Sequence, residues 1–486
     1  MRPNILLIMT DQQRYDSLSC YGGTTVRTPR LDELAAAGAR FEHCYVNGTI
    51  CTPSRASIMT GKPLPGHGVY KLHDCLPDDQ VCFTERLQES GYKTALFGKL
   101  HVSGRVAEAA ARHPHDGFDV YEWCNDPAGL HFDSALNAYG SWLLERFPEV
   151  HAQVAREGKQ MRHFAQQAHF TRWAAQRATE FLRDQDGQSP FFCKLSLFDP
   201  HDPYWDYPEE MAAGVDLSQW EPRPAPAGEA PLPDAVAQER ERLFRPLTDE
   251  ALRASRLGYD ASVAFLDQEI GQVLDTLDTL GLRDNTLVLF VSDHGDMLGD
   301  RELMEKGAFL YEACTRVPLL MRWPQRIAPG TVVSALVQPH DLAATALAAA
   351  GCAEAQRLAW MPHAADLLPL AAGEQAAARD HAVCLYRNSG YGPGGTYYDP
   401  PIHASMYRDP RYKLNVYHHT AASGEPQGEL YDMAADPQET VNLWRDPAHE
   451  QTRRRLEQRL LDWLVEQDWT YNGSRGGEAI VRQSRG

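Results

Sequence analysis

The chain has 486 residues, of which 43% are hydrophobic and 23% charged, a balance typical of a folded enzyme rather than of a disordered protein. Its net charge of −19 argues against general binding to nucleic acid or to acidic membranes, so an anionic substrate needs a local basic pocket. The sequence contains no apolar run of about eighteen residues, and no membrane span is therefore predicted.

The cysteines and the first residues of the chain indicate a cellular compartment. Ten cysteines are scattered without the close pairs of a metal site, which indicates reduced thiols. An apolar strand is predicted to begin at Ile5, which leaves no room for a secretion signal. We therefore expect a cytoplasmic protein.

Short apolar runs bounded by polar residues recur along the chain and are typical of buried parallel strands. The clearest four lie at residues 4–9, 93–97, 191–198 and 286–291, and a fifth lies at residues 317–323. Amphipathic patterns predict helices at residues 29–40, 79–90, 170–182, 250–280 and 340–350. Strands that alternate with helices predict an α/β fold with a large, mixed but mostly parallel sheet sandwiched by helices.

Two domains are predicted from the distribution of these elements. The large domain covers residues 1–370, and a smaller α+β domain with an antiparallel sheet and a helix covers residues 371–486. The elements expected in the smaller domain are strands at residues 381–386 and 413–417 and a helix at residues 450–466. Residues 205–250 are rich in proline and show no regular pattern, so we interpret them as a lid or an insertion beside the site.

Polar side chains follow each of the four clearest strands. They are Asp11 and Gln12, Lys99 and His101, His201, and Asp293 and His294. Because the carboxyl ends of parallel strands open onto one edge of a sheet, we expect these clusters to meet there. Two aspartates beside a histidine have the chemistry of a metal site.

The segment Cys51-Thr52-Pro53-Ser54-Arg55 lies just after the first strand and helix, and Thr60-Gly61 follows it. Residues 57–60 are predicted to be helical, which places Arg55 one turn from Cys51. A cation at that distance suits an anionic substrate. Taken alone, a cysteine before a helix is more often a buried and inert thiol.

This segment resembles the signature of the type I sulfatases, a formylglycine-dependent family within the alkaline phosphatase-like superfamily. In that family a modifying enzyme oxidises the cysteine to formylglycine. Gly98-Lys99-x-His101, the Pro-His-x-Pro stretch around His201 and the closing residues 429–443 also resemble the family. The likeness is nearest to the branch of the choline sulfatases and phosphonate monoester hydrolases.

The resemblance implies hydrolysis of a sulfate ester. A hydroxyl of the hydrated formylglycine at position 51 attacks sulfur and expels the alcohol, whose oxygen takes a proton from His201 or Lys306. His101 is our candidate for the base that deprotonates the second hydroxyl, so that the covalent sulfo-enzyme collapses to the aldehyde and free sulfate. The cations expected around the reacting group are Arg55, Lys99 and Lys306.

The resemblance also implies one divalent metal ion. Its expected ligands are Asp11, Gln12, Asp293, His294 and the modified Cys51. Ca²⁺ is the usual ion of the family and suits carboxylate and amide oxygens, whereas the imidazole of His294 suits Mn²⁺ better. Both ions stay open.

Two other functions stay open as well. A phosphonate monoester or phosphodiester hydrolase would use the same nucleophile, and Asp-Gln and Asp-His pairs occur in such relatives. An inactive metal-binding interaction protein is disfavoured because every catalytic position is filled. The implied partners are a small sulfate ester, a formylglycine-generating enzyme and, through the tail after Asp468, further copies of the chain in a homo-oligomer.

Overall fold

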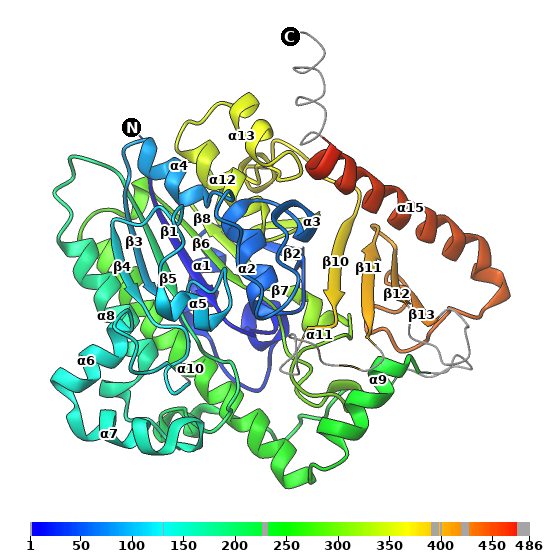
Figure 1. Ribbon diagram of the computed structural model, residues 1–486, viewed down its shortest axis with the longest axis horizontal. Coiled ribbons are helices and arrows are strands. Elements are labelled where there is room, and N and C mark those ends of the chain that lie inside the picture. The colour runs from blue at the N-terminus through cyan, green and yellow to red at the C-terminus, as the bar shows by residue number, and fades with distance from the viewer. Residues whose placement is uncertain are drawn as a thin grey trace, which may run out of the picture.

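The four clearest predicted strands lie side by side at the centre of one sheet (Figure 1). The computed structural model describes residues 2–129, 131–225, 232–389, 398, 401–418 and 427–473. In their order across the sheet, the central strands are β3 (Lys93–Gly98), β5 (Phe191–Ser196), β1 (Asn4–Thr10) and β6 (Thr286–Ser292). Neighbours among them are parallel and buried on both faces, which explains why they read as continuous apolar runs.

The outer strands make this sheet mixed. They are β4 (Val120–Trp123), β8 (Leu319–Arg322), β2 (Ala39–Tyr45), β7 (Arg316–Val317) and β9 (Thr331–Val337). β4 continues the parallel part beyond β3, whereas β8 is antiparallel to β6 and β2 is antiparallel to β8. The predicted α/β fold with a large, mixed and mostly parallel sheet is confirmed.

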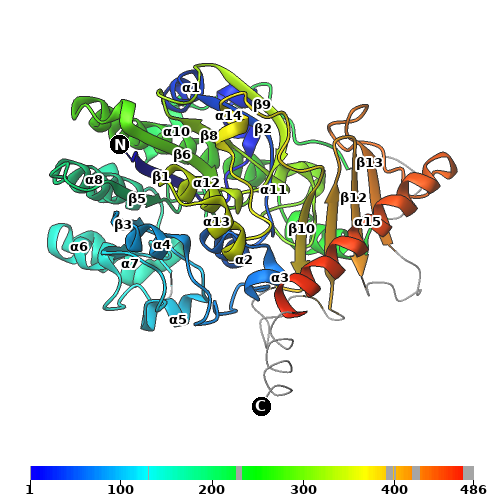
Figure 2. The ribbon, with the colours of Figure 1, turned by 90° about the horizontal axis from the view of Figure 1, so that it is seen from above.

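Helices cover both faces of the sheet, as the two views in Figures 1 and 2 show. One face is covered by α1 (Pro29–Ala36), α8 (Phe170–Arg183) and α10 (Asp249–Thr279). The other face is covered by α2 (Cys51–Thr60), α4 (Phe83–Glu89) and α12 (Asp341–Ala349). Successive side chains of β1 point to opposite faces of the sheet. Leu6 packs against the first set of helices and Leu7 against the second.

Shorter helices connect these elements. They are α3 (Leu64–His67), α5 (Arg105–Ala110), α6 (Ala138–Arg146), α7 (Pro148–Glu157), α9 (Asp234–Glu239), α11 (Glu312–Thr315), α13 (Glu354–Trp360) and α14 (Leu368–Ala371). Within the described residues, none of the helices combines the length and the apolar character that a membrane crossing requires.

A second, smaller sheet lies beside the first. Its four antiparallel strands are β10 (Ala382–Arg387), β11 (His403–Arg408), β12 (Tyr412–His418) and β13 (Gln427–Asp432). The long helix α15 (Glu450–Asp468) runs along this sheet (Figure 1) and packs Leu456 and Leu460 against Leu414 and Leu430. The predicted C-terminal α+β unit is confirmed, and the boundary at residue 371 stays a prediction.

Two expectations about individual elements need correction. The helix predicted at residues 29–40 ends at Ala36, and β2 begins at Ala39. Between them Gly38 passes so close to β8 that a Cβ atom would lie 2.1 Å from the carbonyl oxygen of Met321. Residues 205–250 were expected to contain no regular element, yet α9 lies there, and its Ala235 is fully buried in the core.

A buried ion-pair triad joins the two sheets. Lys413 of β12 is fully buried, and its Nζ lies 2.9 Å from Oε1 of Glu312 and 2.7 Å from Oε1 of Glu439. Glu439 also accepts a hydrogen bond from the backbone N–H of Glu312. Glu312 begins α11, which lies directly before β7 of the large sheet. Burial raises the pKa of the Glu312 carboxyl, but Lys413, Arg316 and Arg408 together outweigh it and lower that pKa to about 2. Lys413 therefore pairs with two buried carboxylates at the junction, and Arg316 and Arg301, each 3.8 Å from one of them, complete the charge balance.

We predict that Lys413→Met lowers the free energy of unfolding by about 3–5 kcal/mol, because two buried carboxylates lose their nearest cation. Urea unfolding followed by circular dichroism measures this loss. The control is Arg411→Met. Arg411 directly precedes β12, and its exposed ion pair with Asp432 is worth less than about 1 kcal/mol. Equal effects of the two substitutions would contradict the assignment of the junction to Lys413.

Candidate active site and metal centre

Cys51 is the first residue of α2 and lies buried where β1 and β6 end. Its Sγ is 3.0 Å from Nε2 of His294 and 3.6 Å from Oδ1 of Asp11. Asp11 directly follows β1, and His294 follows β6 by two residues. The structure therefore brings the cysteine together with side chains from two neighbouring strand ends.

Arg55 links these groups from one turn further along α2. Its Nε donates to Oδ2 of Asp293 at 2.6 Å, and its Nη2 donates to Oδ2 of Asp11 at 3.1 Å. Its Nη1 donates to the carbonyl oxygen of Lys99 at 3.0 Å and to the hydroxyl of Ser196 at 2.9 Å. One buried guanidinium thus contacts the ends of all four central strands.

Positive charge around Cys51 stabilises anions there. Nζ of Lys99 donates to Oδ2 of Asp11 at 2.6 Å. Burial raises the pKa of the Asp11 carboxyl, but Lys99 and Arg55 outweigh it and lower that pKa. Burial also raises the pKa of the Cys51 thiol, but Lys99 and His294 bring it well below its usual range.

Four of the predicted metal ligands converge. One ligand atom each from Asp11, Cys51, Asp293 and His294 lies within 4.8 Å of the others. Nδ1 of His294 contacts the carbonyl oxygen of Gly295 at 2.9 Å, which leaves Nε2 to face the cluster as in a metal-bound histidine. Burial lowers the pKa of His294, but Asp293 and Cys51 raise it to about 9. This donor set fits a divalent metal ion.

Gln12, the fifth predicted ligand, contacts other groups. Its backbone N–H donates to Oδ1 of Asp293 at 3.1 Å. Its side-chain Nε2 donates to Oδ2 of Asp296 at 2.5 Å, and its Oε1 accepts a hydrogen bond from Lys306. Its role as a ligand stays a prediction. Asp296 was not assigned a role from the sequence, although it follows the Asp-His pair closely.

His201 and Lys306 lie together next to the cluster. Nζ of Lys306 is 2.8 Å from Nε2 of His201, which in turn is 4.0 Å from Oδ1 of Asp11. Asp202 accepts from Lys306 at 3.0 Å. Burial raises the pKa of the Asp202 carboxyl, but His201 and Lys306 lower it below its usual range. Sequence reasoning missed Asp202, although its position directly after His201 was a usable signal.

His101 lies on the loop that follows β3. The loop turns at Gly98, whose φ is 106° and where a Cβ atom would lie 2.0 Å from the carbonyl oxygen of Ser196. Nε2 of His101 is 3.1 Å from Oγ1 of Thr52, the residue after Cys51. Burial, with help from Lys99, lowers the pKa of His101 to about 4, so its ring is neutral at neutral pH.

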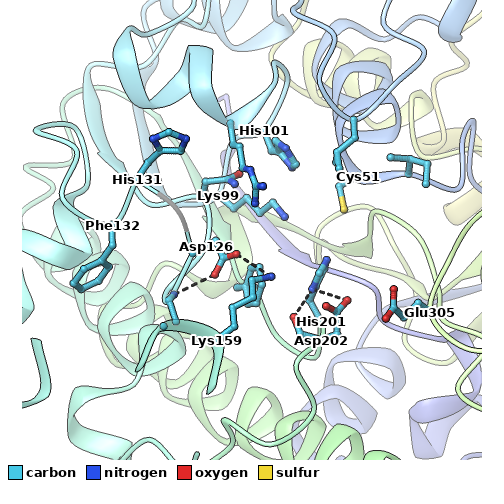
Figure 3. A pocket seen from close by; sticks show the side chains of 18 of the residues that line it. Cys51, Lys99, His101, Asp126, His131, Phe132, Lys159, His201, Asp202 and Glu305 are labelled. Atoms are coloured by element: carbon cyan, nitrogen blue, oxygen red, sulfur yellow. Dashed lines mark hydrogen bonds and ion pairs between the residues drawn. The ribbon is translucent and has the colours of Figure 1, made fainter. Parts of the chain in front are cut away.

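A cavity of about 760 Å³ opens over these groups (Figure 3). The predicted site residues that line it are Cys51, Lys99, His101, His201 and Lys306. The wall across from Cys51 in Figure 3 carries Asp126, His131, Phe132 and Lys159, and Asp126 pairs with Lys159 at 3.1 Å. Glu305 lines the cavity near His201. The cavity is large enough for an organic group attached to the reacting anion.

The wall residues were missed by sequence reasoning. They belong to residues 125–133 and 154–159, where the sequence shows no motif and weak periodicity. Among the described residues of 205–250, none lines the cavity. Instead, Nε1 of Trp205 donates to the carbonyl oxygen of Lys159 at 3.0 Å, behind this wall. The role of residues 205–250 as a lid stays a prediction.

Comparisons with known proteins agree with the fold. The family model described as sulfatase matches residues 3–352, and the model described as N-sulphoglucosamine sulphohydrolase, C-terminal, matches residues 299–466. The second match begins before the predicted boundary at 371 and includes Glu312, which pairs with Lys413 of the small sheet.

Individual relatives are similar over most of their length. The chain is 26% identical to the N-acetylglucosamine-6-O-sulfatase of Bacteroides thetaiotaomicron, covering 94% of this chain and 86% of that protein. It is 30% identical to the choline-sulfatase of Rhizobium meliloti, covering 92% and 83%. Among solved structures, the phosphonate monoester hydrolase of Silicibacter pomeroyi superposes with a TM-score of 0.76 at 25% identity, over 96% of both chains. Because the sulfatase model covers well over half of the chain, this protein belongs to the sulfatase family and is a hydrolase of that class.

Proposed function

We propose that this enzyme hydrolyses sulfate esters with a formylglycine formed from Cys51. The observation that carries the proposal is the position of Cys51, whose Sγ lies among two acidic strand ends and a histidine at the base of a 760 Å³ cavity. An inert structural cysteine would have no need of Lys99, Arg55 and His294 around it. A hydrated formylglycine at this position supplies one hydroxyl as the nucleophile and a second whose deprotonation releases the product.

The surrounding side chains have separable roles in this proposal. Lys99 and Lys306 neutralise the negative charge of the sulfate group, and Arg55 orients the residue at position 51 through the two aspartates. His201 protonates the oxygen of the departing alcohol, with Lys306 beside it as the alternative donor. His101 accepts the proton whose loss returns the site to its starting state.

We further propose one divalent metal ion held by Asp11, Asp293, His294 and the residue at position 51, with Gln12 as a further ligand. Such an ion polarises the oxygens bound to it and stabilises negative charge. Ca²⁺ is the first candidate because the ligands are mainly oxygens, and Mn²⁺ is the second because one ligand is an imidazole.

The second candidate function is hydrolysis of phosphonate monoesters or phosphodiesters with the same nucleophile. The likeness to a phosphonate monoester hydrolase favours it, because that structure superposes over nearly the whole chain. Tetrahedral anions of similar size and charge would be held by the same lysines, so we expect some activity toward both classes. A homo-oligomer, the maturation enzyme as partner and a cytoplasmic location remain predictions.

We predict that enzyme produced together with a formylglycine-generating enzyme hydrolyses an aryl sulfate with a higher kcat/KM than the matching aryl phosphonate. Cys51→Ala is expected to lose about 10⁴-fold or more of either activity, because the nucleophile is removed. Steady-state rates on the two esters, normalised to the converted fraction, measure both effects. A clear preference for the phosphonate would establish the second candidate function in place of the first.

We predict that Ca²⁺ or Mn²⁺ raises the thermal unfolding midpoint of the metal-free protein. At one hundred times its dissociation constant, the bound ion should add about 2.7 kcal/mol to the free energy of unfolding. The ion with the larger shift at equal concentration is the preferred one. Asp293→Asn should abolish the shift because it removes a ligand, whereas the control Asp116→Asn, outside the cluster, should retain it. An unchanged shift in Asp293→Asn would place the ion elsewhere.

A further inference from the structure

The backbone of His101 has a conformation that non-glycine residues rarely adopt. Its φ is 55°, in the left-handed region. Such a conformation costs free energy and persists only where the surroundings hold it in place. The contacts of this loop therefore show what fixes the ring of His101 beside the reacting group.

A buried carboxylate holds the loop from one side. Oε2 of Glu108, on α5, accepts the backbone N–H of His101 at 2.9 Å and the indole N–H of Trp123 at 3.0 Å. Its Oε1 accepts the backbone N–H groups of Val102 at 2.6 Å and of Ser103 at 3.1 Å. Four N–H donors compensate a carboxylate that is only 2% exposed. Glu108 thereby connects the loop to β4, which carries Trp123.

A hydroxyl holds the ring from the other side and selects its tautomer. Oγ1 of Thr52 donates its single proton to the carbonyl oxygen of Leu72 at 2.8 Å. Toward Nε2 of His101, at 3.1 Å, the same oxygen can act only as an acceptor. In the neutral ring the proton must then sit on Nε2, and Nδ1 carries the lone pair. Nδ1 is buried and has no hydrogen-bond partner within the described residues.

We propose that Glu108 and Thr52 are positioning residues for His101: Glu108 fixes the backbone of the loop, and Thr52 fixes the ring with Nδ1 as its proton-accepting atom. Thr52 directly follows Cys51 on α2, so the distance between base and nucleophile is set by a hydrogen bond from the neighbouring residue. The assignment of His101 as a base rests on the proposed function. The hydrogen bonds by which Glu108 and Thr52 hold His101 do not depend on it.

The first test changes the hydroxyl. Thr52→Val keeps the shape of the side chain but removes the acceptor, and kcat on an aryl sulfate should fall about ten- to hundredfold with KM unchanged. Thr52→Ser retains the hydroxyl and should restore most of the rate. Rates are expressed per converted Cys51, with conversion measured by peptide mass. The control Thr84→Val removes another buried hydroxyl, on α4, and should leave kcat unchanged.

A readout without turnover accompanies these rates. Ring ¹⁵N shifts of His101, assigned by comparison with His101→Gln, should show the Nε2–H tautomer in the wild type and in Thr52→Ser. Thr52→Val should shift the population toward Nδ1–H. An unchanged tautomer together with an unchanged kcat in Thr52→Val would overturn the role of Thr52.

The second test changes the carboxylate. Glu108→Gln presents an N–H group to backbone donors, so the amides of residues 101–103 should exchange hydrogen faster and kcat should fall about tenfold or more with KM unchanged. Asp116→Asn is the control, because Asp116 is equally buried and accepts the backbone N–H of Phe118 outside the cavity. Unchanged amide exchange and kcat in Glu108→Gln would overturn the role of Glu108.

The outcomes separate this inference from the proposed function. If fully converted wild-type enzyme hydrolyses neither aryl sulfate nor aryl phosphonate, the proposed function fails. The ring shifts and amide exchange still decide whether Thr52 and Glu108 hold His101. If the wild type is active but the variants change neither tautomer, exchange nor rate, only the positioning roles are wrong.

Discussion

The guanidinium of Arg55 is the contact on which the rest of the site depends. It is fully buried and donates to groups at the ends of β1, β6, β3 and β5. Because it lies one turn from Cys51 on α2, the same interaction sets the place of Cys51, the proposed nucleophile, relative to the acidic strand ends. Its positive charge also compensates the two buried carboxylates that approach each other there.

The other residues of the site lie on both sides of Arg55 along the edge of the sheet. Toward β6, Asp293 and His294 complete the set of proposed metal ligands with Asp11. Toward β3, Lys99 and His101 line the cavity beside Cys51, and the contact of His101 with Thr52 links that loop to the start of α2. Cys51, the proposed metal ligands and His101 are therefore linked by contacts of one short helix, and a shift of α2 would disturb all of these contacts.

The sequence predicted those features that short-range patterns determine. The four central strands were predictable because both of their faces are buried, and their polar ends followed from the parallel arrangement. β11 and β13 were not predicted, because these strands are buried but carry polar residues that interrupt the apolar pattern, among them Ser405, Arg408, Glu429 and Asp432. The hydrogen bonds of Glu108 and the cavity wall at Asp126 depend on tertiary packing of irregular segments, for which the sequence offers no periodic signal. The hydrogen bond that Gln12 accepts from Lys306 was likewise unpredictable, because Lys306 lies almost three hundred residues away in the sequence.

The most direct test of the account is the mass of the proteolytic peptide that contains Cys51, taken from protein coexpressed with a formylglycine-generating enzyme. The account predicts a peptide whose mass matches an aldehyde in place of the thiol, and whose aldehyde reacts with a hydrazide. A peptide that retains the unmodified cysteine, while a known substrate of the same maturation enzyme is converted in the same cells, would contradict it.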